Sequence, residues 1–190
     1  MKRHGIILLA GMLVLDIGIG CWWWHRWKEH RYDKIICEAA VHHDISPALV
    51  KAVVWKESRF DSQARGRAGE YGLMQIRDAA AYEWAASERL RVFHPVLLLD
   101  PRTNTRVGAW YLHKLMRRYT NSDNPVVYAL ADYNAGRGNV LRWYKGEATT
   151  NSAAFLELID FPSTAKYITG ILQKQVDYRA AFQTAQPKYP

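Results

Sequence analysis

Three sites in the chain share one helix-start pattern, a residue able to cap a helix followed directly by proline. They are Ser46-Pro47, Asp100-Pro101 and Asn124-Pro125. Proline suits the first helical position because its φ is already helical and its missing N–H would have no partner there. We therefore expect a helix of about 10–20 residues to begin at each proline. Strand patterns are nearly absent from residue 32 onward, so the sequence favours a mainly α fold.

Apolar periodicity predicts further helices at residues 32–43, 78–91, 139–144 and 164–182, with Ser163 as the cap of the last. The periodicity fails over residues 61–75, an irregular stretch interrupted by Gly66, Gly69 and Gly72. We expect this Gly-rich excursion to hold a small β hairpin, and residues 145–152 to form a polar loop.

The chain has 190 residues, enough for one domain and at most a short appendage. Its 49% hydrophobic content excludes a disordered chain, and two cysteines exclude a disulfide scaffold. No Cys/His spacing suggests a zinc site, and we expect neither a metal nor a cofactor. The net charge of +8 is compatible with nucleic acid, acidic lipid or an anionic polymer as partner. Because the basic residues are scattered and no recognition motif is present, we do not expect a nucleic-acid binder.

The N-terminal segment has the features of a signal peptide. Lys2 and Arg3 precede an apolar run over residues 5–24, which Asp16 interrupts. The eleven residues before Asp16 have the length of a signal-peptide core, and Gly18-Ile19-Gly20 is a small-x-small cleavage pattern. Cys21 follows directly, which resembles a bacterial lipoprotein signal.

An uncleaved membrane anchor is the alternative for the same segment. Its twenty residues are just long enough to span a hydrocarbon core. The tryptophans that follow would form an interfacial belt, namely Trp22, Trp23, Trp24 and Trp27. We therefore expect a signal peptide or anchor over residues 1–31, a folded domain over 32–182 and a tail over 183–190. All these alternatives place the protein in the cell envelope on the periplasmic side, as a membrane-anchored protein, a lipoprotein or a secreted one.

The helix predicted after Pro47 carries a candidate catalytic acid. Its apolar stripe consists of Leu49, Val50, Val53 and Val54. The next position of that stripe is Glu57, a carboxyl on the core-facing side near the helix C-terminus. Burial and the negative end of the helix dipole both raise the pKa of such a carboxyl, so that it is able to donate a proton near neutral pH. The alternative is a solvent-facing glutamate that pairs with Lys56 or Arg59.

Four motifs from Glu57 onward point to one family. They are Glu57-Ser58-Arg59-Phe60, Gly72-Leu73-Met74-Gln75-Ile76, Tyr133-Asn134-Ala135-Gly136 and Phe161-Pro162-Ser163-Thr164-Ala165-Lys166-Tyr167. In content, order and spacing they resemble the catalytic domain of the soluble lytic transglycosylases (family 1), over about residues 32–182. One tetrapeptide is weak support, whereas four in order are strong.

The resemblance implies a lysozyme-like α+β fold, mainly helical, with a small β element beside a cleft. It implies cleavage of the β-1,4 bond between N-acetylmuramic acid and N-acetylglucosamine in peptidoglycan, leaving 1,6-anhydro ends. Glu57 would be the single catalytic acid and base. The substrate-binding positions would be Ser58, Met74, Gln75, Tyr133, Asn134 and Tyr167. The partners would be peptidoglycan strands and, through the N-terminal segment, the membrane.

The sequence departs from the family pattern at three positions. Many members carry Ser where this chain has Gly66, Glu where it has Ser163, and Arg where it has Ala165. Asp61 and Glu70 are additional carboxylates, which we expect to be solvated loop residues. Either one facing Glu57 across the cleft would favour a hydrolytic reaction similar to that of goose-type lysozymes. A non-catalytic glycan-binding scaffold is the other alternative, and the intact motif residues argue against it.

Overall fold

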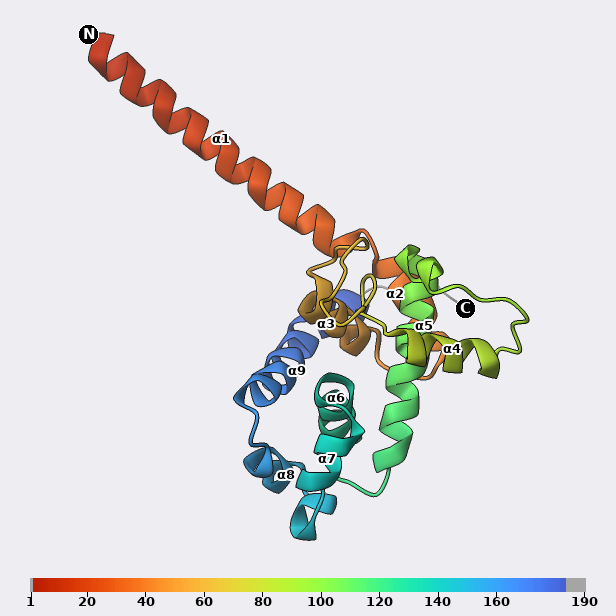
Figure 1. The fold of residues 1–190 in the computed structure, drawn as a ribbon. Helices are drawn as coiled ribbons and strands as arrows, with labels where there is room; N and C mark the ends of the chain where they lie inside the picture. Colours follow the sequence, from red (N-terminus) through yellow and green to blue (C-terminus); the bar gives the residue numbers. More distant parts are fainter. Residues whose placement is uncertain (1, 184–190) are drawn as a thin grey trace.

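The computed structural model describes the backbone of residues 2–183 and the side chains of residues 12–182 (Figure 1). Its α-helices are α1 (Lys2–His30), α2 (Asp33–His42), α3 (Pro47–Ser58), α4 (Asp78–Ser87), α5 (Pro101–Met116), α6 (Pro125–Ala135), α7 (Arg137–Trp143), α8 (Ser152–Leu158) and α9 (Pro162–Gln183). Three short 3-10 helices complete the described elements: η1 (Pro95–Leu99), η2 (Arg117–Tyr119) and η3 (Gly146–Thr149). The prediction of a mainly α fold is confirmed.

All three helices predicted from a capping residue and proline begin at the proline. Asp100 also caps α5, since its carboxylate accepts a hydrogen bond from the Thr103 backbone N–H at 2.7 Å. Ser46 and Asn124 make no such side-chain bond. The prolines therefore fix these starts more consistently than the capping side chains do.

Other boundaries differ from the sequence predictions. α4 ends at Ser87 rather than at residue 91, and α9 begins at Pro162, so Ser163 lies inside its first turn and does not cap it. The expected loop at 145–152 contains η3 and the start of α8, which Asn151 caps by accepting from the N–H groups of Ala153 and Ala154. A seven-residue helix is too short to show a clear period in the sequence.

The Gly-rich stretch contains no named strand among the described residues. Two isolated antiparallel bridges, Arg65–Tyr71 and Tyr71–Ile76, stand where we expected a small hairpin. The stretch is an irregular loop between α3 and α4 that doubles back on itself at Tyr71.

The core is built around α3, which lies beside α9 and also packs on α2 (Figure 1). Every residue of α3 from Ala48 to Val54 is buried, including Lys51. The Lys51 ammonium lies 2.6 Å from Asp33 Oδ1 and 4.8 Å from the centre of the Tyr178 ring. An ion pair and an aromatic face thus compensate a charge that would otherwise be costly to bury.

Helix α1 projects away from the rest of the molecule (Figure 1). Its C-terminal end is held by a hydrogen bond from the Tyr178 hydroxyl to Glu29 Oε1 at 2.6 Å. Beyond it, Arg31 donates to the Phe60 carbonyl at 3.2 Å. Cys21 and the four tryptophans of the predicted belt are exposed.

Within the part of the chain whose side chains are described, no helix is both long and apolar enough to span a membrane. Most of the predicted signal-peptide core, up to residue 11, and the C-terminal tail from residue 184 lie outside the described side chains.

Candidate active site

A cleft of about 770 Å³ opens between the end of α3, the Gly-rich loop, α5 and the end of α6. Among its lining residues are Glu57, Glu70, Gln75, Tyr111, Tyr133 and Asn134. Four of these are candidate site residues from the sequence, contributed by three motifs that lie far apart along the chain. The fold therefore brings Glu57, Gln75, Tyr133 and Asn134 to one cavity.

Glu57 occupies the last turn of α3, where the stripe of buried residues predicted it. Its side chain is partly buried, and Tyr167 donates a hydrogen bond to its Oε1 at 2.5 Å. The pKa of Glu57 is raised from its ordinary value of 4.5 to about 7, mainly by burial and to a smaller extent by the charge of Glu70. The Tyr167 hydrogen bond and the Lys56 charge lower it, without cancelling the effect of burial. A carboxyl with this pKa holds or releases a proton readily at neutral pH.

Tyr167 reaches Glu57 from α9, the helix that packs beside α3. It is buried, and burial together with the Glu57 charge holds its pKa well above the ordinary value of 10.0. The hydroxyl therefore keeps its proton near neutral pH and acts as a hydrogen-bond donor to the carboxylate.

The turn over residues 72–76 is held in place by Asn104, whose side chain is buried and comes from α5. Asn104 Oδ1 accepts from the Met74 N–H at 2.8 Å, and its Nδ2 donates to the carbonyls of Tyr71 at 2.7 Å and Leu98 at 2.8 Å. Gly72 has a φ of +70°, and a Cβ there would lie 2.4 Å from the Leu98 carbonyl oxygen. Only glycine fits this position, so the motif's glycine is needed for the turn that carries Gln75.

Side chains of α6 are joined by hydrogen bonds to the Gly-rich loop and to α9. The Tyr133 hydroxyl donates to the Met74 carbonyl at 2.7 Å, and Asn134 Oδ1 accepts from the Thr164 hydroxyl at 2.9 Å. These bonds connect the second motif to the third and the third to the fourth. Tyr133 and Asn134, which line the cleft together with Glu57, are thus held in place from two other segments of the chain.

The family is decided by comparison with known proteins. Residues 34–156 match the family described as the Transglycosylase SLT domain. The chain belongs to this family. The match ends before the fourth motif, so the place of Tyr167 in the site depends on its hydrogen bond to Glu57.

Relatives of this SLT domain include proteins named as lytic murein transglycosylases. It is 31% identical over 138 residues to the soluble lytic murein transglycosylase of Salmonella typhimurium, and the aligned region covers 72% of this chain and 21% of that protein. It is 33% identical over 113 residues to the membrane-bound lytic murein transglycosylase F of Desulfosudis oleivorans, covering 58% and 23% of the two chains.

Solved structures of the same class superpose on it. An inactive glutamate-to-glutamine mutant of the lytic transglycosylase Slt from Pseudomonas aeruginosa matches with a TM-score of 0.73 at 27% identity, covering 81% of this chain and 25% of that one. The 70 kDa soluble lytic transglycosylase of Escherichia coli matches with a TM-score of 0.70, also at 27% identity, over 80% and 24% of the two chains. The chain thus spans about a fifth to a quarter of the length of these four proteins.

Three predicted substrate-binding positions of the SLT domain are not among the residues that line the cleft: Ser58, Met74 and Tyr167. Tyr167 is buried, and its hydroxyl donates to Glu57. Met74 is fully buried, and a Cβ on Gly108 would lie 2.2 Å from its sulfur, so this side chain fills the space above α5. The Ser58 hydroxyl donates back to the Val54 carbonyl of its own helix at 3.2 Å. Through its carbonyl, Met74 instead binds the hydroxyl of Tyr133, a residue that does line the cleft.

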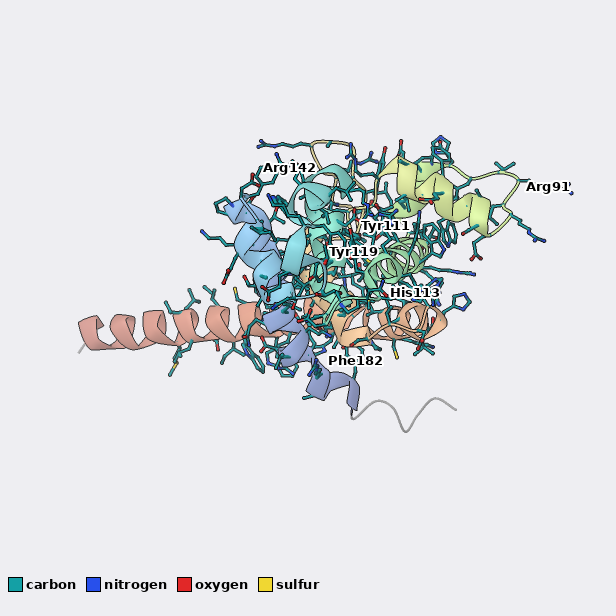
Figure 2. The ribbon with its side chains drawn as sticks, turned by 90° about the horizontal axis from the view of Figure 1, so that it is seen from below. Arg91, Tyr111, His113, Tyr119, Arg142 and Phe182 are labelled. Carbon is teal, nitrogen blue, oxygen red and sulfur yellow. The ribbon has the colours of Figure 1, made fainter. Side chains whose placement is uncertain are left out.

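Sequence reasoning missed other parts of the site. Tyr111 of α5 (Figure 2) lines the cleft, with its ring centre 5.6 Å from that of Tyr133, and no motif singles it out. Thr164 lies inside the fourth motif, yet only the fold shows that it binds Asn134. Glu70, expected to be a solvated loop residue, lines the same cleft as Glu57.

Proposed function

We propose that this SLT domain is a peptidoglycan lytic transglycosylase that uses Glu57 as its only acid and base in forming 1,6-anhydro ends. The observation that carries the proposal is a partly buried carboxyl in a polar cleft, with its pKa near 7 and a tyrosine hydroxyl bonded to it. The names of its relatives support the same substrate and reaction class.

The bond to be broken is the β-1,4 linkage between N-acetylmuramic acid and N-acetylglucosamine. Glu57 protonates the glycosidic oxygen as the bond from that oxygen to C1 of muramic acid breaks. Positive charge that develops at C1 is stabilised by the substrate's own N-acetyl group and by the carboxylate left on Glu57. The muramic acid C6 hydroxyl then bonds to C1, and Glu57 takes up its proton. The acid is restored and no water is consumed.

The groups around Glu57 serve this cycle in different ways. The Tyr167 hydrogen bond favours the carboxylate and thereby helps Glu57 to release its proton in the first step. Gln75, Tyr133 and Asn134 line the cleft and offer amide and aromatic groups to sugar hydroxyls and CH surfaces. Tyr111 extends this aromatic wall.

We infer further that residues 32–182 form the catalytic domain, and that residues 1–31 direct it to the envelope as a signal peptide or anchor. Some relatives are named as membrane-bound and others as soluble. Detection of an acylated Cys21 at the mature N-terminus would establish the lipoprotein alternative, whereas an intact N-terminus in the membrane fraction would establish the anchor.

Replacing Glu57 by glutamine tests the catalytic assignment. The amide keeps the shape of the side chain and cannot donate the proton, so the release of muropeptides from purified sacculi should fall by at least about 10²-fold. Glu157→Gln, at an exposed position of α8, is the matched control and should keep full activity. A folded Glu57→Gln variant that retains most of the activity would exclude Glu57 as the acid. Mass spectrometry of the released muropeptides tests the product, since anhydro ends are expected and their absence would refute the transglycosylase reaction.

A further inference from the structure

A second carboxylate, that of Glu70, lies in the same cleft as Glu57. Only 23% of its side chain is exposed. Its Oε2 accepts a hydrogen bond from the Ala68 N–H at 3.1 Å, and Arg77 Nε lies 4.0 Å from its Oε1. The loop backbone and a guanidinium therefore hold this carboxylate in place.

The position of the Glu70 carboxylate depends on the absence of a side chain at residue 66. A Cβ on Gly66 would lie 2.0 Å from Glu70 Oε2 and 2.9 Å from Gln75 Oε1. Gly66 has no positive φ that would itself call for glycine. The glycine is explained by the space that the carboxylate occupies, packed against the backbone of its own loop beside Gln75.

The charge of Glu70 also acts on Glu57. The charge of Glu70 contributes to the raised pKa of Glu57. Such an effect falls off with distance, so Glu70 lies within electrostatic range of the acid. A pair of carboxyls flanking one glycosidic bond, one as acid and the other as the base for a water molecule, is the arrangement by which glycosidases hydrolyse that bond with inversion.

We propose that Glu70 is a second catalytic carboxylate, which directs part of the turnover from ring closure to hydrolysis. This inference rests on the proposed function, because both reactions begin when Glu57 protonates the leaving oxygen. In the hydrolytic branch the bond from C1 to the leaving oxygen breaks and a water oxygen bonds to C1. Glu70 takes one proton from that water and then releases it to solvent, while Glu57 takes up one proton from solvent, so both groups return to their starting states. The products are a reducing N-acetylmuramic acid end and a free hydroxyl on N-acetylglucosamine.

The nucleophile that reaches C1 first decides the product. The C6 hydroxyl is part of the substrate, so its attack needs only Glu57 as base. Water has to be held and deprotonated, which Glu70 supplies from the loop wall of the cleft. The enzyme should therefore release both anhydro and reducing ends, and the ratio between them should depend on Glu70.

Product analysis of the full-length protein tests this. Purified sacculi are digested with the unaltered enzyme, with Glu70→Gln and with the control Glu157→Gln. The digests are reduced with borohydride, and muropeptides with anhydro and reduced muramic acid ends are quantified by mass spectrometry. A positioned general base contributes about 10²-fold or more, so Glu70→Gln should lower the ratio of reducing to anhydro ends at least about tenfold. The control should leave the ratio unchanged.

A second variant tests the same ratio independently, in case Glu70→Gln does not fold. Gly66→Ala keeps the glutamate but takes the space of its carboxylate, so it should lower the same ratio. The proposal is overturned if the unaltered enzyme makes no reducing muramic acid ends, or if neither variant changes the ratio. Either result leaves the transglycosylase reaction intact. Reducing ends without any anhydro ends would instead refute the proposed function.

Discussion

Tyr167→Phe should raise the pKa of Glu57. The change keeps the buried ring and removes only the hydroxyl, which donates to Glu57 Oε1 at 2.5 Å. This hydrogen bond lowers the pKa of Glu57 and acts against the effect of burial. A hydrogen bond to a charged group contributes about 1.5–3 kcal/mol, and 1.36 kcal/mol corresponds to one pKa unit. Without the hydroxyl, the pKa of Glu57 should therefore rise from about 7 by roughly one to two units.

The pH dependence of turnover measures this change. Glu57 must be protonated in order to donate its proton to the glycosidic oxygen, so activity falls as the pH rises through its pKa. Initial rates at low sacculus concentration should show this fall near pH 7 in the unaltered enzyme, and at higher pH in Tyr167→Phe. Tyr82→Phe, at a half-exposed position of α4, is the control and should leave the profile in place.

A second variant, Glu70→Gln, should shift the pH profile in the opposite direction. Glu70→Gln removes a charge that raises the pKa of Glu57, so its profile should move to lower pH. Profiles that stay together in both variants, or that move in the same direction, would refute the electrostatic account of Glu57.

Two further predictions concern stability, read from urea unfolding. Asp33→Asn should lower the free energy of unfolding by about 2 kcal/mol or more, because the fully buried Lys51 loses a carboxylate 2.6 Å away. Adding Lys51→Met should restore most of the lost free energy of unfolding, and no recovery would contradict the ion-pair explanation. Gly72→Ala should cost about 1–3 kcal/mol, since it adds a Cβ 2.4 Å from the Leu98 carbonyl at a positive φ. Gly69→Ala, at a φ of +85° in open space, should cost less, and an equal cost would show that the clash is not the cause.

The features that the sequence predicts well are local. A proline at the first helical position acts on its own turn, and all three helices marked in this way begin where expected. The stripe that leads to Glu57 is a property of one helix, so its direction could be extrapolated over four residues. The raised pKa of Glu57 follows from that direction, because burial is its largest cause.

The features that the sequence does not predict depend on contacts between distant segments. Asn104 holds a turn that lies some thirty residues earlier, and in the sequence it is one polar residue of an ordinary helix. In the sequence Glu70 looks like a solvated loop residue, and only the fold shows that its carboxylate packs beside Gly66 and lines the cleft. Met74 shows the reverse case, since a residue within a strong motif fills the core while its carbonyl serves the site.

The raised pKa of Glu57 also affects the stability of the fold. A carboxyl binds its proton more tightly in the native state when its pKa there, about 7, exceeds its ordinary value of 4.5. Its contribution to stability is then fully present below about pH 4.5 and is lost as the pH rises through about 7. Above about pH 7, where Glu57 is ionised, the buried carboxylate therefore lowers the stability of the fold. α3 tolerates this at its last turn because the rest of the helix, from Ala48 to Val54, is buried against the core. Tyr167, on the neighbouring helix α9, stabilises the carboxylate by donating a hydrogen bond to it. The packing of α3 on α9 therefore contributes both to the stability of the fold and to the pKa of the acid.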